Sequence, residues 1–366
     1  MTGILSIFTD LRTLVLFIAT FTLIVAVHEF GHFASARLLG MKVLEFAFGF
    51  PPRLWGIRRG ETEYTINWVP FGGFVRILGQ DDFSIQQQGT GDPRSFTAKP
   101  WWAQAIVLAA GVFMNFVLAA VILTLAFMVG GATAPTGDVR IFDVKPNSPA
   151  AVAGIHVGDI VVDVDGTPIH TSRAMQTIIN KAAQKTQEIT IDLQRDGTPI
   201  AVKSVPRAEP PPGEGALGVE LQEVQVPVWL GPPQAFDRAS GTIRDVVAQI
   251  VALPGQLISQ RDTPTGGAPV VGGPIEIFRV TGQVAAQGLP AVLLLIGVLS
   301  VNLGVINIIP FPGLDGGRLF FVLLGALLRR RLSPQVEAAI HAVGFVLLIG
   351  LLVIVSISDV RRASGG

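Results

Sequence analysis

Four long apolar stretches dominate the hydrophobic pattern of this 366-residue chain. A helix needs roughly 20 apolar residues to cross the hydrocarbon core of a bilayer, so the pattern predicts four membrane-spanning helices. The first stretch ends in Ala34-Ser-Ala36, which is also typical of a signal-peptide cleavage site, but it is too long for one. The stretches are Leu14 to Ala36, Ala103 to Val129, Ala291 to Ile309 and Ile340 to Ile357.

Shorter patterns fill the segment between the first two stretches. Apolar and polar residues alternate over Val43 to Phe50 and Glu63 to Trp68, and a glycine turn at Gly72 and Gly73 precedes a third run. Alternation of this kind predicts β-strands. We therefore expect a small antiparallel sheet with unusually hydrophobic faces, associated with the membrane.

The segment after the second stretch is of a different kind. From Val139 to Leu221 it contains short alternating runs and many turn residues, which predicts a separate soluble α+β domain. Apolar residues at helical spacing between Pro233 and Ser259 predict an amphipathic helix lying in the membrane interface, and a flexible joint is expected over 266–273. The expected parts are 1–130 with two spans and the β segment, 135–224 with the soluble domain, 225–285 with the linker and interfacial helix, and 286–366 with two spans.

Composition supports a membrane protein, since 49 % of residues are hydrophobic and only 15 % are charged. The formal net charge is zero, so no overall field favours nucleic acid as a partner. There are no cysteines, which excludes thiolate metal sites, disulfides and cysteine nucleophiles. A metal ion must be bound by His, Asp or Glu.

Lys and Arg near the ends of the spans predict the orientation. They gather in the first loop, as at Arg37, Lys42 and Arg53, and in the third loop at Arg329 to Arg331. Both loops are predicted to be cytoplasmic, which places the soluble domain and both termini outside. Arg361 and Arg362 argue weakly for the opposite orientation.

The strongest chemical signal is His28-Glu-Phe-Gly-His32 in the first span. On a helix the two imidazoles lie one turn apart on one face, where both can bind one Zn²⁺ ion, and Glu29 is the candidate general base toward a zinc-activated water. The preceding residues 13–27 carry no charge, and ionisable side chains at membrane depth are usually functional.

A catalytic zinc usually takes a third protein ligand. His156 and His170 lie in the soluble domain, on the wrong side of the membrane, whereas His341 at the start of the last span stays open. Asp315 is better placed, in Asn307-Ile-Ile-Pro-Phe-Pro-Gly-Leu-Asp-Gly-Gly317. Its prolines break the helix and its glycines allow close backbone approach, although Asp315 could instead cap the next helix.

Together these two motifs resemble those of bacterial site-2 proteases, close to the regulator of sigma-E protease group. The histidine motif maps to His28, Glu29 and His32, and the Asn-x-x-Pro-x-Pro-x-Leu-Asp-Gly motif maps to Asn307 through Gly316. The resemblance implies that Asp315 is the third zinc ligand. It also implies a bacterial inner-membrane zinc metalloprotease that cleaves transmembrane protein substrates in regulated intramembrane proteolysis, with anti-sigma factors or remnant signal peptides as substrates.

Parts of the soluble domain, including Asn147-Ser-Pro-Ala150 and Asp165-Gly-Thr-Pro-Ile169, resemble a bacterial PDZ domain. PDZ domains hold a peptide or chain end at a sheet edge, although a β-rich spacer without a ligand is the alternative. The expected fold class is therefore an α-helical polytopic membrane protein with four transmembrane helices in the lipid bilayer, a membrane-associated β segment and one extracytoplasmic PDZ-like α+β domain.

A substrate helix must be unwound before it is cut. Ala47 to Phe50 resembles the family's membrane-associated β segment, and we expect Phe48 and Gly49 to position the substrate as an added strand on an edge formed by Phe46 to Phe50. Asn307 either hydrogen-bonds the substrate backbone or only holds helices together. The competing hypotheses are a membrane metal transporter and a PDZ scaffold without proteolytic activity.

Overall fold

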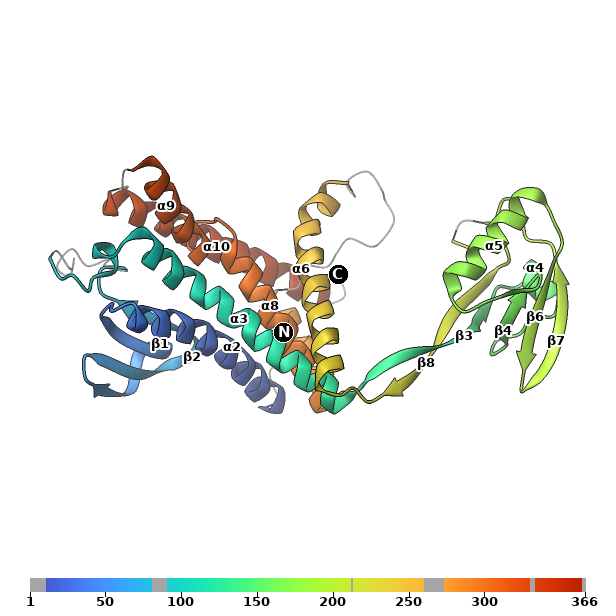
Figure 1. Cartoon of the computed structure of the whole chain (residues 1–366), viewed down its shortest axis with the longest axis horizontal. Coiled ribbons are helices and arrows are strands. Elements are labelled where there is room, and N and C mark those ends of the chain that lie inside the picture. Colours follow the sequence, from blue (N-terminus) through green and yellow to red (C-terminus); the bar gives the residue numbers. More distant parts are fainter. Residues whose placement is uncertain (1–10, 81–90, 212, 260–272, 330–332, 364–366) are drawn as a thin grey trace. The chain divides into compact units, whose positions relative to one another are not determined.

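The computed structural model describes residues 11–80, 91–211, 213–259, 273–329 and 333–363. They form two compact units, one made of Met1–Gly130 with Leu230–Gly366 and the other of Gly131–Trp229 (Figure 1). The expected joint at 266–272 and the basic residues Arg330 and Arg331 lie outside the described residues.

Four helices in the described part of the first unit are long and apolar enough to cross a membrane, which confirms the four predicted spans. In the described residues, α3 packs against both α2 and α8 (Figure 1). Small residues allow this close packing: a methyl group at Gly31 of α2 would lie 2.4 Å from the Ala110 carbonyl oxygen of α3. The four helices are α2 Leu11–Leu38, α3 Trp101–Gly130, α8 Leu289–Ile308 and α10 Pro334–Ala363.

The predicted β segment forms two long strands, β1 Val43–Arg59 and β2 Thr62–Ile77. The register pairs Phe46 with both Tyr64 and Val75, and Phe48 with both Ile66 and Gly73. The stretch from Glu45 to Phe48 therefore lies between the two ends of β2. The expectation that Phe46 to Phe50 offers a free strand edge is wrong for Phe46 to Phe48, because their main chains already have partners on both sides.

One face of this sheet packs on the helices. Phe46, Val75 and Ile77 join a core with Ala36 of α2 and Val107 of α3. Farther along the β segment large apolar side chains are exposed, since Trp55, Trp68 and Phe50 are each about half exposed or more. Exposed aromatic side chains of this kind suit a sheet that contacts lipid.

The described residues of the first unit also form the helices α6 Pro232–Ser259, α7 Pro274–Ala285 and α9 Asp315–Leu328. The predicted amphipathic helix exists as α6, but Ile243, Val247 and Ile250 pack around Ala119 of α3 and Val301 of α8. It therefore packs against two spans, and its place in the membrane interface stays a prediction. Its periodicity predicted an apolar face but not the element that covers this face.

The described residues of the second unit form an antiparallel sheet of order β7-β6-β4-β3-β8, in which β5 also pairs with β4, and two helices. Its core includes Ile141, Val161, Met175 and Ile191. Strands β3 and β8 extend beyond the predicted limits, because residues 132–135 pair with residues 225–228. The elements are β3 Ala132–Val144, α4 Pro149–Val152, β4 Ile160–Val164, β5 Thr167–Pro168, α5 Ser172–Lys185, β6 Ile189–Arg195, β7 Thr198–Ser204 and β8 Val219–Val228.

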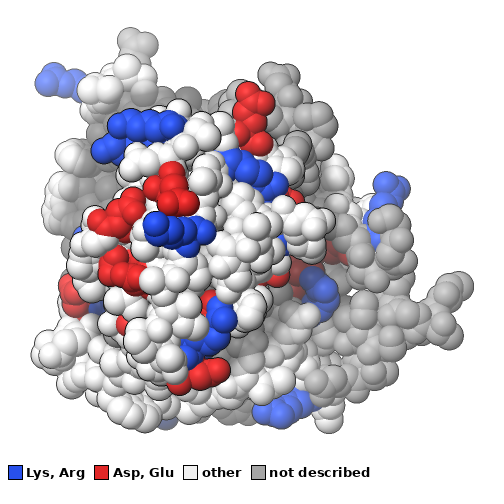
Figure 2. All heavy atoms as spheres, turned by 90° about the vertical axis from the view of Figure 1, so that its right-hand side faces the viewer, with Lys and Arg blue, Asp and Glu red and all other residues white. Residues whose placement is uncertain are grey.

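A buried ion pair stabilises the second unit. Asp159 is 1 % exposed and accepts hydrogen bonds from Arg195 Nε and Nη2, each at 2.7 Å, and from the His156 main-chain N–H. Burial raises the pKa of Asp159, but the hydrogen bonds from Arg195 and His156 outweigh it and hold the pKa below its ordinary value. On the face drawn in Figure 2, acidic and basic side chains are interspersed among uncharged ones.

Candidate metal centre

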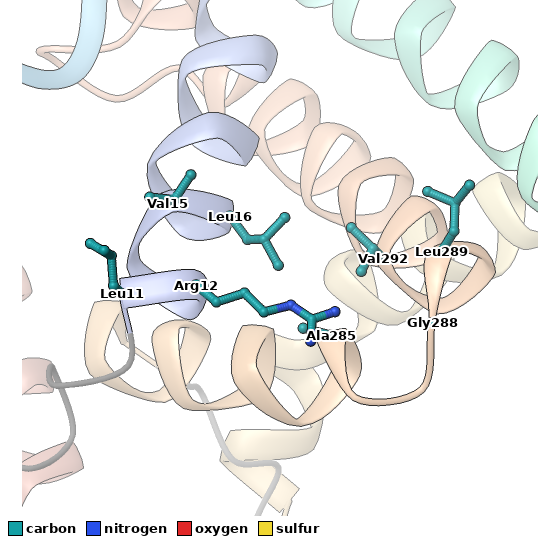
Figure 3. Close-up of a pocket in the computed structure, with 8 residues that line it drawn as sticks. All are labelled: Leu11, Arg12, Val15, Leu16, Ala285, Gly288, Leu289 and Val292. Carbon is teal, nitrogen blue, oxygen red and sulfur yellow. The ribbon is translucent and has the colours of Figure 1, made fainter.

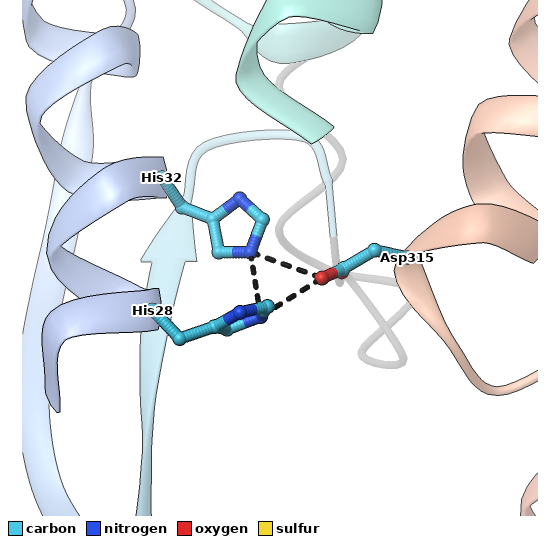
Figure 4. A group of neighbouring side chains, drawn as sticks. All are labelled: His28, His32 and Asp315. Atoms are coloured by element: carbon cyan, nitrogen blue, oxygen red, sulfur yellow. Dashed lines mark hydrogen bonds and ion pairs between the residues drawn. The ribbon is translucent and has the colours of Figure 1, made fainter. Parts of the chain in front are cut away.

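The two histidines of the predicted motif lie one turn apart on α2, both buried. Their Nε2 atoms are 3.2 Å apart. Asp315 Oδ2 lies 2.9 Å from His28 Nε2 and 3.1 Å from His32 Nε2, so three potential ligand atoms converge on one point (Figure 4). The structure therefore brings Asp315 to His28 and His32, from which it is separated by 283 or more residues in the sequence.

Asp315 reaches this point because the chain turns sharply between α8 and α9. Helix α8 ends at Ile308, and Asp315 is the first residue of α9. Gly313 has a φ of +98°, which favours glycine. A methyl group at Gly316 would lie 2.4 Å from the Ile308 carbonyl oxygen. The glycines and prolines of the motif thus shape the turn that presents the carboxylate.

His341, the alternative third ligand, has a different place. Its Nδ1 accepts a hydrogen bond of 2.9 Å from the Gly313 main-chain N–H, and it is outside the group of three ligand atoms. Near it on α10, Gly344 packs closely on Pro312. Helix α10 therefore supports the turn that carries Asp315. His156 and His170 belong to the second unit.

Helix α3 contacts the histidines from behind. The Val107 carbonyl oxygen lies 2.8 Å from His32 Nδ1, and Asn115 Nδ2 lies 3.1 Å from His28 Nδ1. Between them, a methyl group at Gly111 would lie 2.3 Å from His32 Nε2. The sequence reasoning missed these residues. One signal for them was present in the sequence: Asn115 is the one amide side chain between residues 105 and 130, within an apolar span.

Glu29 lies beside the β segment. It is partly buried, and its Cγ would be 3.8 Å from a methyl group at Gly73 of β2. Gly73, which is next to Glu29, pairs with Phe48 of β1. Phe48 is therefore separated from Glu29 by the strand that contains Gly73. Phe48 is 37 % exposed, whereas Gly49 is buried with a φ of +76°. Asn307 lies in the last turn of α8 and is partly buried.

A separate hollow of about 570 Å³ lies at the other end of α2. Figure 3 shows Arg12 extending from α2 toward Ala285 at the end of α7, below the apolar side chains of Leu16 and Val292. Its lining contains no histidine or carboxylate among the described residues, so this hollow offers no donor set for zinc.

The three converging donors suit Zn²⁺. Zinc sites with catalytic function usually take three ligands of imidazole and carboxylate type and leave a position for water. Here two imidazole nitrogens and one carboxylate oxygen meet at a buried point, and the outer nitrogen of His32 is held by a main-chain carbonyl, as is usual for metal-binding histidines.

Comparison with known proteins agrees with this chemistry. The family model "Peptidase family M50" matches residues 16–351. A putative zinc metalloprotease of Clostridium perfringens is 36 % identical over 344 residues, covering 93 % of this chain and 96 % of its own length. The zinc metalloprotease RasP of Oceanobacillus iheyensis is 27 % identical over 435 residues, covering 96 % and 99 % of the two chains.

Among solved structures, the PDZ domain of an SdrC-like protein from Listeria monocytogenes is 20 % identical and covers 25 % of this chain and 93 % of that domain, with a TM-score of 0.22. A similarity at this TM-score carries no functional conclusion. The match to the family model and the relatives over nearly the full length do carry one. The chain belongs to peptidase family M50 and is a zinc metalloprotease of the multi-pass membrane type.

Proposed function

We propose that His28, His32 and Asp315 bind the catalytic zinc ion and that Glu29 is the general base. The observation that carries this proposal is the convergence of two histidine Nε2 atoms and one Asp315 oxygen within about 3 Å of one another, from opposite ends of the chain. A bound zinc ion supplies Lewis-acid activation of water and of the scissile carbonyl.

Glu29 follows His28 directly in helix α2, so its main chain is adjacent to that of a proposed ligand. In this role it takes a proton from the attacking water and delivers it to the leaving amine nitrogen. Its partly buried position beside Gly73 also places it where a substrate chain on the sheet would pass.

The substrate is a transmembrane segment of another protein, bound in extended form. Since Phe46 to Phe48 are paired on both sides, we assign the accepting edge to β2 around Gly73, next to Glu29. Phe48 and Gly49 then position the substrate from the neighbouring strand, through the exposed Phe48 side chain. Asn307, at the end of α8, contributes a hydrogen bond to the substrate backbone.

The proposed setting is the bacterial inner membrane, with the metal site toward the cytoplasm and the termini and second unit outside. The basic residues of the first loop support this orientation. Trp101 and Trp102 at the start of α3 are exposed, as is typical of residues at a membrane interface. In this setting the second unit acts as a PDZ-like domain that holds a peptide or chain end of the substrate, and anti-sigma factors or remnant signal peptides are suitable substrates.

The first experiment compares the wild-type protein with Glu29→Gln and His28→Ala, all purified in detergent. Zinc content is measured, and cleavage of a model single-span substrate is followed. We expect Glu29→Gln to retain zinc and lose cleavage by at least about 100-fold, whereas His28→Ala loses zinc. Full cleavage by Glu29→Gln would exclude it as the base, and a normal zinc content of His28→Ala would exclude the ligand set.

A further inference from the structure

One face of α3 contacts the outer nitrogens of both histidines. Val107, Gly111 and Asn115 are four residues apart, so they lie in one row along the helix. Val107 and Asn115 are fully buried at 0 % exposure. The row contacts His32 through the Val107 carbonyl oxygen at 2.8 Å and His28 through the Asn115 amide at 3.1 Å.

The contact to His32 fixes its tautomer. A neutral imidazole carries one N–H, and its other nitrogen is the one that binds a metal. The Val107 carbonyl oxygen can only accept a hydrogen bond, so His32 Nδ1 carries the proton. Nε2 of His32 is therefore bare and faces the point where Asp315 Oδ2 lies.

The contact to His28 can take two forms, because the Asn115 amide can present its nitrogen or its oxygen. With Nδ2 toward the ring, as in the structure, His28 Nδ1 accepts, and the proton of His28 lies on Nε2, facing Asp315 at 2.9 Å. A half-turn of the amide places Oδ1 at the same spot. Oδ1 then accepts from Nδ1–H, and Nε2 becomes bare.

A second observation concerns the same amide. Asn115 Oδ1 is buried and has no hydrogen-bond partner among the described residues. A buried acceptor without a partner destabilises the folded state. The half-turn gives this oxygen a donor and at the same time gives His28 the tautomer that zinc requires.

We propose that Asn115 is the positioning residue of His28: with zinc bound, its Oδ1 accepts from His28 Nδ1–H and keeps Nε2 bare for the metal. This inference rests on the ligand set proposed above. It gives each histidine one α3 partner, a main-chain carbonyl for His32 and a side-chain amide oxygen for His28.

The effect on zinc affinity follows from the partner that is lost. Removing an outer partner of a metal-binding histidine typically weakens metal binding by about 10–100-fold. Asn115→Leu keeps the number and branching of the side-chain heavy atoms but has no acceptor, so we expect a loss of this size. Asn115→Asp has the same shape and can only accept, so we expect it to bind zinc at least as tightly as the wild type.

A matched control lies at the same helix contact. Ser300 of α8 donates a hydrogen bond of 2.9 Å to the Asn115 main-chain carbonyl. Ser300 and Asn115 are equally buried. Ser300→Ala therefore removes a hydrogen bond in an equally buried place without changing any contact of the histidine ring. A general loosening of the α3–α8 contact would weaken zinc binding in this variant too, whereas we expect the wild-type affinity.

The test uses the full chain in detergent micelles. Zinc dissociation constants are measured by chelator competition for the wild type, Asn115→Leu, Asn115→Asp, Ser300→Ala and His28→Ala, and the visible spectrum of bound Co²⁺ reports the ligand geometry. A 10–100-fold loss in Asn115→Leu with wild-type binding in Asn115→Asp supports the proposal.

Wild-type affinity in Asn115→Leu, or an equal loss in Asn115→Asp, overturns it. Should Asn115→Leu fail to fold, Asn115→Ala replaces it with the same expected loss, and a tenfold loss in Asn115→Asp still overturns the proposal. If His28→Ala binds zinc normally, the ligand set fails as well. If His28→Ala loses zinc and Asn115→Leu does not, only the role of Asn115 fails.

Discussion

Gly111 is the position where the smallest substitution should have the largest effect on the metal site. In Gly111→Ala the new methyl group would lie 2.3 Å from His32 Nε2 and 2.8 Å from His28 Cε1. Ordinary van der Waals contact begins at 3.4 Å. The His32 ring would have to move by about 1 Å, whereas metal–ligand distances in zinc sites tolerate only about 0.2 Å.

A shift of this size affects binding and catalysis together. We expect Gly111→Ala to bind zinc at least about tenfold more weakly, and to cleave a model substrate about 100-fold more slowly even at saturating zinc, since a misplacement of catalytic groups by about 1 Å has an effect of that order. Zinc affinity is measured by chelator competition, and cleavage is followed on a single-span substrate in detergent.

Gly350→Ala provides the matched control. Gly350 lies in the membrane-spanning helix α10, and a methyl group there meets nothing within 4 Å. The same substitution at this site should leave zinc affinity and cleavage unchanged. Wild-type zinc affinity and full activity in Gly111→Ala would refute the reasoning, because they would show that the alanine methyl group fits beside the two imidazole rings.

Two further predictions concern supporting residues. The folded-state pKa of Asp159 lies below its unfolded-state value, so its stabilisation is present above the unfolded-state value of 3.8 and is lost as the pH falls through the lower folded-state value. Asp159→Asn should therefore lower the stability of the second unit by about 2 kcal/mol at neutral pH and have less effect at about pH 3. Hydrogen exchange of β4 and β6 in the full chain measures this, and an equal difference at both pH values would contradict it. His341→Ala should remove about 1 kcal/mol from the turn that carries Asp315 and weaken zinc binding several-fold by chelator competition; an unchanged affinity would mean that Gly344 and Pro312 suffice.

Much of the architecture follows from local patterns. Long apolar runs predict the four spans, and the spacing of His28 and His32 on one helix face places both Nε2 atoms together. Asp315 was identifiable because an acidic residue beside helix-breaking prolines and glycines, at the end of a span, usually belongs to a functional site. These features are readable because each depends on residues close to one another in the sequence.

The features that could not be predicted depend on contacts between distant residues. Phe46 and Phe48 alternate like any strand, and nothing in that alternation shows that residues 63–66 and 73–76 pair with the same stretch. The apolar face of α6 is visible in its period, but its partners on α3 and α8 are not. The importance of Gly111 and Asn115 lies in their contacts with the imidazole rings of His28 and His32, which are about 80 residues earlier in the chain.

The position of Asp315 has a consequence for the synthesis of the enzyme. The two proposed ligands on α2 are synthesised early, whereas the proposed third ligand, Asp315, follows 287 residues after His28, after the entire second unit. A growing chain therefore contains the histidine motif for most of its translation without a complete site. With the ligand set proposed above, proteolytic competence therefore has to wait until α8 and α9, which carry Asp315, have been made and inserted.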